Sequence, residues 1–206
     1  MYKKINGEQE HYTCIFAHGA GAPMDSTFME VFSEGLALQG IKVVRFEFPY
    51  MQERRLNGKK RPPNRQPELI SCFEQVISEV AEPCVLVGKS MGGRMASILA
   101  ALAPDHKYVK GVVALGYPFH PQGKPEKLRT AHLPDIAVPM SIVQGTRDAL
   151  GDKELVTALS LPKSITIDWL EDGNHDFKPR VKSGFKHEEH IETAIKTCAQ
   201  FVKQCL

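Results

Sequence analysis

Strand-like and helix-like patterns alternate along the whole chain, and this alternation restricts the possible folds more than any other feature. Short apolar runs rich in β-branched residues lie at residues 12–16, 42–46, 84–87, 111–115, 140–143 and 165–169. The apolar residues in these runs are consecutive, which is typical of strands that are covered on both faces. The runs therefore predict about six strands inside a layered protein.

Helical patterns fill the segments between these runs. Apolar side chains recur at helical spacing over residues 27–39, 67–80, 91–103 and 190–205, and more weakly over 152–159. The first pattern begins with a capping box, Thr27-x-x-Glu30, and ends at Gly40. The alternation predicts an α/β fold, a three-layer α/β/α sandwich with a mostly parallel sheet. No repeat or change of composition divides the chain, so we expect one domain over residues 1–206.

A glycine-rich segment at residues 88–93 has the sequence GKSMGG and lies between a strand pattern and a buried helix pattern. It matches G-x-S-x-G, in which a sharp strand-to-helix turn exposes a serine hydroxyl. Ser90 would then lie at a helix N-terminus, where free N–H groups favour a developing negative charge. An ordinary glycine-rich turn with an incidental serine is the alternative, and the flanking strand and helix favour the nucleophile.

A serine nucleophile needs a general base, and the base needs an acid that orients it. In this architecture they follow in the order Ser, acid, His, each beyond the end of a strand. Asp148 follows the fifth strand pattern and His175 follows the sixth, so we interpret them as acid and base. The rival acids are Asp152, which is better placed as a helix N-cap, and Asp172 and Asp176, which lie in the histidine loop. We expect the later histidines, at 187 and 190, to be solvated.

Acyl transfer also needs two N–H donors for the oxyanion of the tetrahedral intermediate. The first strand pattern leads into residues 18–21, HGAG, whose glycines allow the backbone to approach a substrate closely. We expect the donors to be the N–H groups of Ala20 and of Met91, the residue after the nucleophile. His18 and Gly19 are candidate substrate-binding residues, with His18 supporting the loop through hydrogen bonds rather than acting as a second base.

A basic segment extends over residues 53–66, with six Lys or Arg residues and one acid. It follows a strand, so we expect a long loop at the sheet edge that also carries Ser90. Arg54, Arg55 and Arg61 are candidates for binding a carboxylate or phosphate of the substrate. A solvated surface loop is an equally good interpretation. The net charge of +2 and the single flanking aromatic residue, Tyr50, do not favour nucleic acid as a partner.

Together these motifs resemble the α/β-hydrolase superfamily, in particular its small lidless members related to dienelactone hydrolases. The matching segments occur in the family's order, at residues 18–21, 88–93, 145–148 and 173–177. The resemblance implies a triad of Ser90, Asp148 and His175, oxyanion donors at Ala20 and Met91, and about six parallel strands. The chain is short for a separate cap domain, and it has serine where dienelactone hydrolases typically use cysteine.

We therefore expect a serine hydrolase that acts on an ester or thioester through an acyl-enzyme. The alternatives are a non-catalytic binding or scaffold protein with this fold and, less favoured, a serine peptidase. No cofactor or metal is expected, because the histidines of residues 187–190, HEEH, are three positions apart rather than the four of a zinc motif.

The expected partner is a small-molecule acyl substrate, with an anionic one suggested by the basic segment. The sequence has no apolar stretch of about 18 residues, so no membrane span is predicted. Residues 1–6 do not lead into the apolar part of a secretory signal. Five cysteines, an odd number without a CxxC pair, do not indicate a disulfide framework. We expect Cys14, Cys84 and Cys198 to be core residues and the protein to be cytoplasmic.

Overall fold

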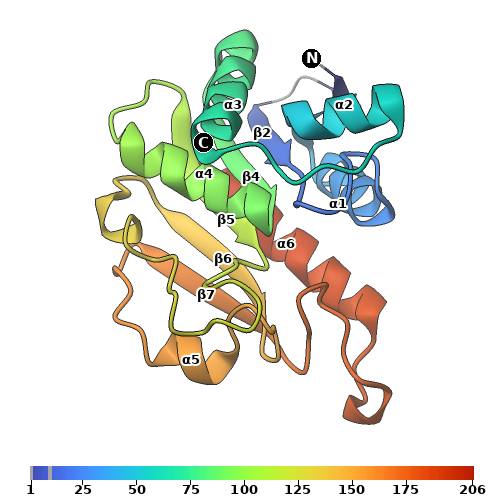
Figure 1. Cartoon of the computed structure of the whole chain (residues 1–206), viewed down its shortest axis with the longest axis vertical. Coiled ribbons are helices and arrows are strands. Elements are labelled where there is room, and N and C mark those ends of the chain that lie inside the picture. Colours follow the sequence, from blue (N-terminus) through green and yellow to red (C-terminus); the bar gives the residue numbers. More distant parts are fainter. Residues whose placement is uncertain (1, 9–10) are drawn as a thin grey trace.

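The computed structural model describes residues 2–8 and 11–206. Its strands form one sheet in the order β1-β3-β2-β4-β5-β6-β7. Figure 1 shows the part of this sheet that runs from β2 through β4, β5 and β6 to β7. The strands are β1 (Lys3–Asn6), β2 (Tyr12–Ala17), β3 (Ile41–Phe46), β4 (Cys84–Lys89), β5 (Val109–Leu115), β6 (Met140–Gly145) and β7 (Ile165–Leu170). Strands β2 to β7 pair in parallel, and β1 pairs antiparallel with β3 at one edge.

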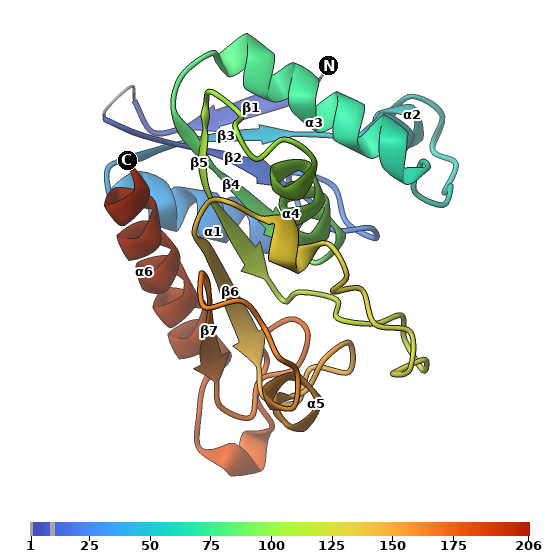
Figure 2. The same cartoon turned by 90° about the vertical axis from the view of Figure 1, so that its left-hand side faces the viewer.

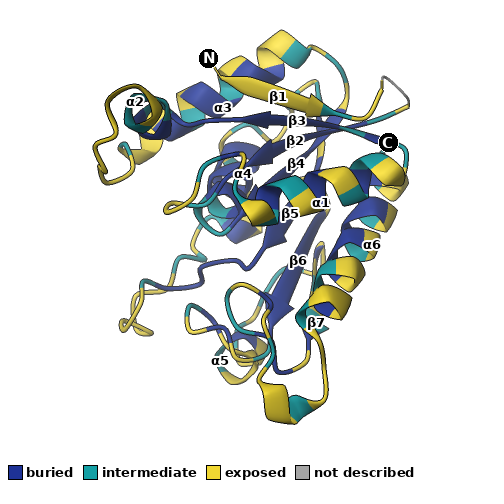
Figure 3. Ribbon diagram, turned by 90° about the vertical axis from the view of Figure 1, so that its right-hand side faces the viewer, coloured by how far each residue is buried: buried dark blue, intermediate teal, exposed yellow. Residues whose placement is uncertain are grey.

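All six predicted strands are present, and β1 is an addition. The sequence analysis missed β1 because its four residues are largely exposed and form no apolar run. At this edge of the sheet the side chains of β1 face solvent, so they can be polar. Figure 3 shows this contrast, with β1 exposed and the central strands buried.

Helices cover both faces of the sheet (Figure 2). They are α1 (Thr27–Leu38), α2 (Pro49–Asn57), α3 (Gln66–Val80), α4 (Met91–Leu102), α5 (Lys153–Thr157) and α6 (His187–Cys205). Helices α3 and α4 pack on one face, and α1 and α6 pack on the other. The predicted three-layer α/β/α arrangement is therefore confirmed.

The central strand β4 explains why the apolar runs are continuous. Leu86 belongs to the core beneath α3 and α4, whereas Val85 and Val87 belong to the core beneath α1 and α6. Successive side chains of a strand point to opposite faces, so a strand between two helical layers needs apolar residues at every position. The cysteines expected in the core, Cys14, Cys84 and Cys198, are buried.

The predicted loop over residues 53–66 is wrong in its first part, because α2 extends to Asn57. This helix has Pro49 in its first turn and ends at Gly58, which has a φ of 70° and donates its N–H to the Arg54 carbonyl at 2.8 Å. Only Tyr50 and Met51 are buried, so the helix has too few apolar residues for a clear periodic pattern.

The predicted capping box at the start of α1 is also wrong. Ser26 is the N-cap residue and makes no side-chain capping bond. Glu30 instead pairs with the fully buried Arg45 at 2.9 Å and with Lys4 at 2.9 Å. An ion pair with a buried guanidinium competes for the carboxylate that would otherwise reach back to the helix start.

The expectation that both late histidines are solvated is wrong for His190. Helix α6 begins at His187, earlier than the sequence predicted, and His190, in the first turn of this helix, is buried. The His190 Nδ1 donates to the Phe177 carbonyl at 2.8 Å, which connects the helix to the preceding loop. Among the described residues, no helix combines the length and the apolar character that crossing a membrane requires.

Candidate active site

Ser90 lies in a sharp turn between β4 and α4. Its φ of 51° and ψ of −114° are unusual for a residue with a side chain, and its N–H donates to the Leu115 carbonyl at 2.9 Å. A Cβ on Gly88 would lie 2.1 Å from the carbonyl carbon of Gly92, and a Cβ on Gly92 would lie 2.5 Å from the Ala17 oxygen. Both glycines are required because the turn packs against itself and against the end of β2.

The imidazole of His175 connects Ser90 to Asp148. His175 lies in the loop after β7, and its Nε2 is 2.9 Å from the Ser90 Oγ across 85 positions of sequence. Its Nδ1 is 2.8 Å from an oxygen of Asp148, which is fully buried. An ionised carboxylate only accepts hydrogen bonds, so Nδ1 carries the proton and Nε2 is left to accept the serine proton. This is the arrangement of a general base beside its nucleophile.

Asp148 is held by a residue that the sequence analysis missed. Gln144 at the end of β6 is fully buried, and its Nε2 donates to Asp148 at 3.0 Å. The Gln144 amide also accepts from the Tyr117 N–H at 2.7 Å, and the N–H of Leu150 donates to the second oxygen of Asp148 at 2.8 Å. The available signal was a polar residue inside an apolar strand, four positions before the candidate acid.

The three rival acids have other partners. Asp152 accepts from the Leu155 N–H at 2.9 Å and caps α5, as predicted. Asp172 accepts from the backbone N–H of Arg180 at 2.7 Å, and the hydrogen bonds with the Arg180 guanidinium lower the pKa of Asp172 to about 2. Asp176 is exposed and lies 3.5 Å from the Lys89 Nζ.

The candidate oxyanion loop follows β2, opposite the start of α4. The N–H groups of Ala20 and Met91 donate to no other group within the described part of the chain. Both residues line a cavity that Ser90 also lines. The Tyr50 hydroxyl donates to the Ala20 carbonyl at 3.0 Å and so fixes the loop from behind.

His18 lies beneath this loop and is fully buried. Its Nδ1 donates to the Gly19 carbonyl at 2.7 Å, and its Nε2 accepts from the Phe48 N–H at 3.1 Å. Burial lowers the pKa of His18, which favours the neutral ring that both bonds require. His18 is therefore placed as a structural support, whereas Gly19 lines a cavity beside Ser90.

The arginines of the basic segment are not brought to the nucleophile. Arg55 binds the buried carboxylate of Glu47 at 2.5 Å and Asp25 at 2.6 Å. Arg54 donates to the Gly21 carbonyl at 3.3 Å, and Arg61 pairs with Glu53 at the surface. Within the described part of the chain, none of these three arginines lines either cavity beside Ser90. The guanidinium groups that we expected to bind a substrate therefore already have partners within the protein.

Two cavities flank the Ser90 hydroxyl. One has a volume of about 340 Å³ and is lined by Phe28, Met29, Lys89 and His175, among others. The second has a volume of about 420 Å³ and lies over the start of α4. A small molecule bound at Ser90 therefore has space on two sides of this residue.

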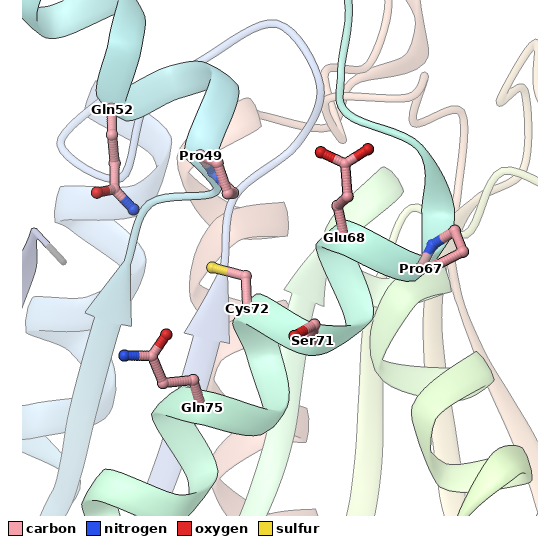
Figure 4. Close-up of a pocket in the computed structure, with 7 residues that line it drawn as sticks. All are labelled: Pro49, Gln52, Pro67, Glu68, Ser71, Cys72 and Gln75. Atoms are coloured by element: carbon pink, nitrogen blue, oxygen red, sulfur yellow. The ribbon is translucent and has the colours of Figure 1, made fainter.

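A larger cavity of about 600 Å³ lies between α2 and α3 (Figure 4), and its lining residues do not include Ser90, Asp148 or His175. Cys72 is among its lining residues, and burial raises the pKa of this thiol to about 11. The thiol is protonated near neutral pH, so it is a poor nucleophile. Among the described residues, no cluster of three or more His, Cys, Asp or Glu side chains is placed to hold a metal ion.

Lys89, the residue before the nucleophile, is a second residue whose role the sequence did not indicate. Its Nζ donates to the backbone carbonyl of His175 at 2.6 Å and lies 5.5 Å from the centre of the Phe28 ring. Burial lowers the pKa of Lys89, and the charge of Asp176 opposes that shift. The lysine therefore connects the nucleophile turn to the loop that carries the base.

Comparison with known proteins supports the fold independently. A family model described as an alpha/beta hydrolase domain matches residues 10–203. The chain is similar to a dienelactone hydrolase from Anabaena variabilis, with a TM-score of 0.74 and 17% identity over 99% of this chain and 91% of that chain. It is also similar to a monoacylglycerol lipase from Paleococcus ferrophilus, with a TM-score of 0.63 and 18% identity over 95% and 98% of the two chains.

A third similar structure is a serine hydrolase without lid from Xanthomonas campestris. Its TM-score is 0.63 at 18% identity, over 95% of this chain and 86% of that chain. At such identities the likeness concerns the fold, and the chemistry has to be argued from the residues of the site.

Proposed function

This chain belongs to the alpha/beta hydrolase domain family, and from that premise we propose that it is a serine hydrolase that cleaves an ester or thioester. The observation that carries the proposal is the pair of contacts made by His175, 2.9 Å to the Ser90 Oγ and 2.8 Å to Asp148. A scaffold protein has no need for a buried carboxylate, an oriented imidazole and a strained serine at one point.

The first half of the reaction forms the acyl-enzyme. His175 Nε2 takes the proton of the Ser90 hydroxyl while Oγ bonds to the substrate carbonyl carbon. The carbonyl oxygen becomes an oxyanion, which the N–H groups of Ala20 and Met91 stabilise. The imidazolium then gives its proton to the leaving oxygen or sulfur as the bond from that atom to the acyl carbon breaks.

The second half releases the acyl group. A water molecule gives a proton to His175 Nε2 and its oxygen attacks the acyl carbon of the ester on Ser90. The imidazolium returns the proton to Ser90 Oγ as that bond breaks, and a carboxylic acid leaves. Asp148 stays ionised and holds the imidazole in the tautomer that both halves need.

The test combines covalent labelling with a substrate series. We expect a fluorophosphonate probe to label the wild type and not Ser90→Ala. We also expect hydrolysis within a chain-length series of p-nitrophenyl esters and acyl thioesters. A folded wild type that takes no label and cleaves no member of the series would overturn the proposal in favour of a non-catalytic binding protein.

We also propose a cytoplasmic place of action. The buried cysteines Cys14, Cys72, Cys84 and Cys198 are free thiols, which suits a reducing compartment. Fractionation of cells that express the tagged protein would test this, and recovery from the secreted fraction would contradict it.

A further inference from the structure

The cavity over the start of α4 is lined by two arginines without an acidic partner. Arg94, in the first turn of α4, and Arg129, in the segment between β5 and β6, line this cavity together with Ser90. No Asp or Glu is among its lining residues. Across residues 2–8 and 11–206, neither arginine takes part in an ion pair, whereas Arg55 has two carboxylate partners.

The guanidinium group of Arg94 has few hydrogen-bond partners. Its Nε is buried without a partner in the described structure, and its Nη2 lies 3.5 Å from the Gln66 Oε1, which is at the limit of a hydrogen bond. Burial lowers the pKa of Arg94, Tyr117 opposes that shift, and the charge of Arg129 adds to it. Two like charges that line one cavity repel each other, and a bound anion would offset this repulsion.

The backbone around both arginines is fixed. The N–H of Arg129 donates to the Phe119 carbonyl at 2.7 Å, and the Arg129 carbonyl accepts from the Tyr117 hydroxyl at 2.8 Å. The Ser97 hydroxyl donates to the Arg94 carbonyl at 2.8 Å. The guanidinium groups therefore extend from fixed positions, which lowers the entropy lost when a ligand binds.

The two cavities beside Ser90 differ in the half of the substrate that they can hold. His175 must deliver a proton to the leaving atom, and His175 lines the other cavity, with Phe28 and Met29. The leaving group therefore belongs on that side, where Lys89 is already paired with Asp176. The acyl group belongs in the cavity that Arg94 and Arg129 line.

We propose that Arg94 and Arg129 form an anion-binding subsite for a carboxylate at the far end of the acyl group. This inference rests on the proposed function and makes it more specific: the preferred substrates are monoesters or monothioesters of dicarboxylic acids. A guanidinium binds a carboxylate through two parallel hydrogen bonds, so two arginines fix both the charge and the direction of the acyl chain.

The test compares esters that share one leaving group. The probes are 4-methylumbelliferyl monoesters of succinate, glutarate and adipate, each paired with the same diacid capped as its methyl ester. For at least one chain length, we expect kcat/KM for the free carboxylate to exceed that for the capped ester by about 10- to 100-fold.

The variants assign this preference to the two arginines. We expect Arg129→Gln and Arg94→Gln each to lower the ratio of kcat/KM between free and capped esters by about tenfold or more, and Arg129→Lys to lower it less. Lys127→Gln is the matched control, because it removes one positive charge from the same segment at an exposed position outside the cavity. If Arg94→Gln does not fold, as judged by circular dichroism, Arg129→Gln decides alone.

Two results would overturn the subsite. One is equal cleavage of free and capped esters by the wild type. The other is a loss of preference in Lys127→Gln as large as in Arg129→Gln, which would indicate a general effect of charge. In either case cleavage of the capped esters would leave the proposed hydrolase function standing. Failure of every ester together with failure of probe labelling would instead overturn that function.

Discussion

Gln144 donates a hydrogen bond of 3.0 Å to Asp148 from a fully buried position on β6, four residues earlier in the chain. The same side-chain nitrogen lies 3.0 Å from the Gly151 carbonyl, beyond the turn that carries Asp148. One amide therefore fixes both ends of the turn that presents the acid to His175. The position of the acid depends on a side chain that never meets a substrate.

Gln144→Leu should impair both activity and stability. Leucine has a similar size but leaves the Tyr117 N–H and a lone pair of Asp148 without partners, so we expect a loss of about 1–3 kcal/mol in the free energy of unfolding. We expect kcat to fall about tenfold with little change in KM, because Asp148 acts on the base and not on substrate binding. Urea unfolding and steady-state kinetics measure these effects. Gln75→Leu, at an exposed position of α3, is the control: it loses only the exposed hydrogen bond to Glu79, so it should change the free energy of unfolding by less than about 0.5 kcal/mol and leave kcat unchanged.

Asp148→Asn should reduce kcat by about 10⁴-fold while the protein stays folded. An amide can donate to His175 Nδ1, which moves the imidazole proton to Nε2, and that nitrogen then cannot accept the serine proton. Hydrolysis of an activated ester by purified variants measures the effect. The control is Asp152→Asn, which alters a helix cap and should keep activity near that of the wild type. Comparable losses in both variants would contradict the assignment of the acid.

Asp172→Asn should lower stability in a way that depends on pH. The hydrogen bonds from Arg180 depress the pKa of folded Asp172 to about 2, below the value of about 3.9 for an unfolded chain. A depressed pKa means that the ionised carboxylate stabilises the folded state above about pH 4, and that this stabilisation is lost as the pH falls through about 2. The difference in melting temperature between wild type and variant should therefore be largest near neutral pH and shrink in acid. A difference that stays constant with pH would contradict the ionic origin.

Gly92→Ala should destabilise the nucleophile turn. The new methyl group would lie 2.5 Å from the Ala17 oxygen, which is backbone and has little room to move. We expect a loss of about 1–3 kcal/mol in the free energy of unfolding. Gly21→Ala is the control for stability, because a Cβ there meets no atom within 4 Å, and it should change the free energy of unfolding by less than about 0.5 kcal/mol. Equal stability of the two variants would show that the turn tolerates a side chain.

Apolar runs predicted the sheet well, because a strand that is buried on both faces needs apolar residues at consecutive positions, as in residues 84–87. They missed β1, which is exposed at an edge, and α2, which buries only Tyr50 and Met51. Both elements are held by neighbours rather than by an apolar face of their own. A pattern of hydrophobic residues carries little information about such elements.

For the candidate site, the sequence by itself indicated Ser90, Asp148 and His175 but not Gln144 or Lys89, which hold them in place. Within the turn at residues 88–93, Gly88 is needed for a local steric reason, because a Cβ there would meet Gly92. The positions of Asp148 and His175 after strands bring both to one edge of a parallel sheet. Only the tertiary structure decided which charged groups were already satisfied. Arg55 is bound to Glu47, whereas Arg94 and Arg129 face a cavity without a carboxylate. The physical reason is that a turn depends on neighbouring residues, whereas the pairing of a charge depends on side chains that approach from distant parts of the chain.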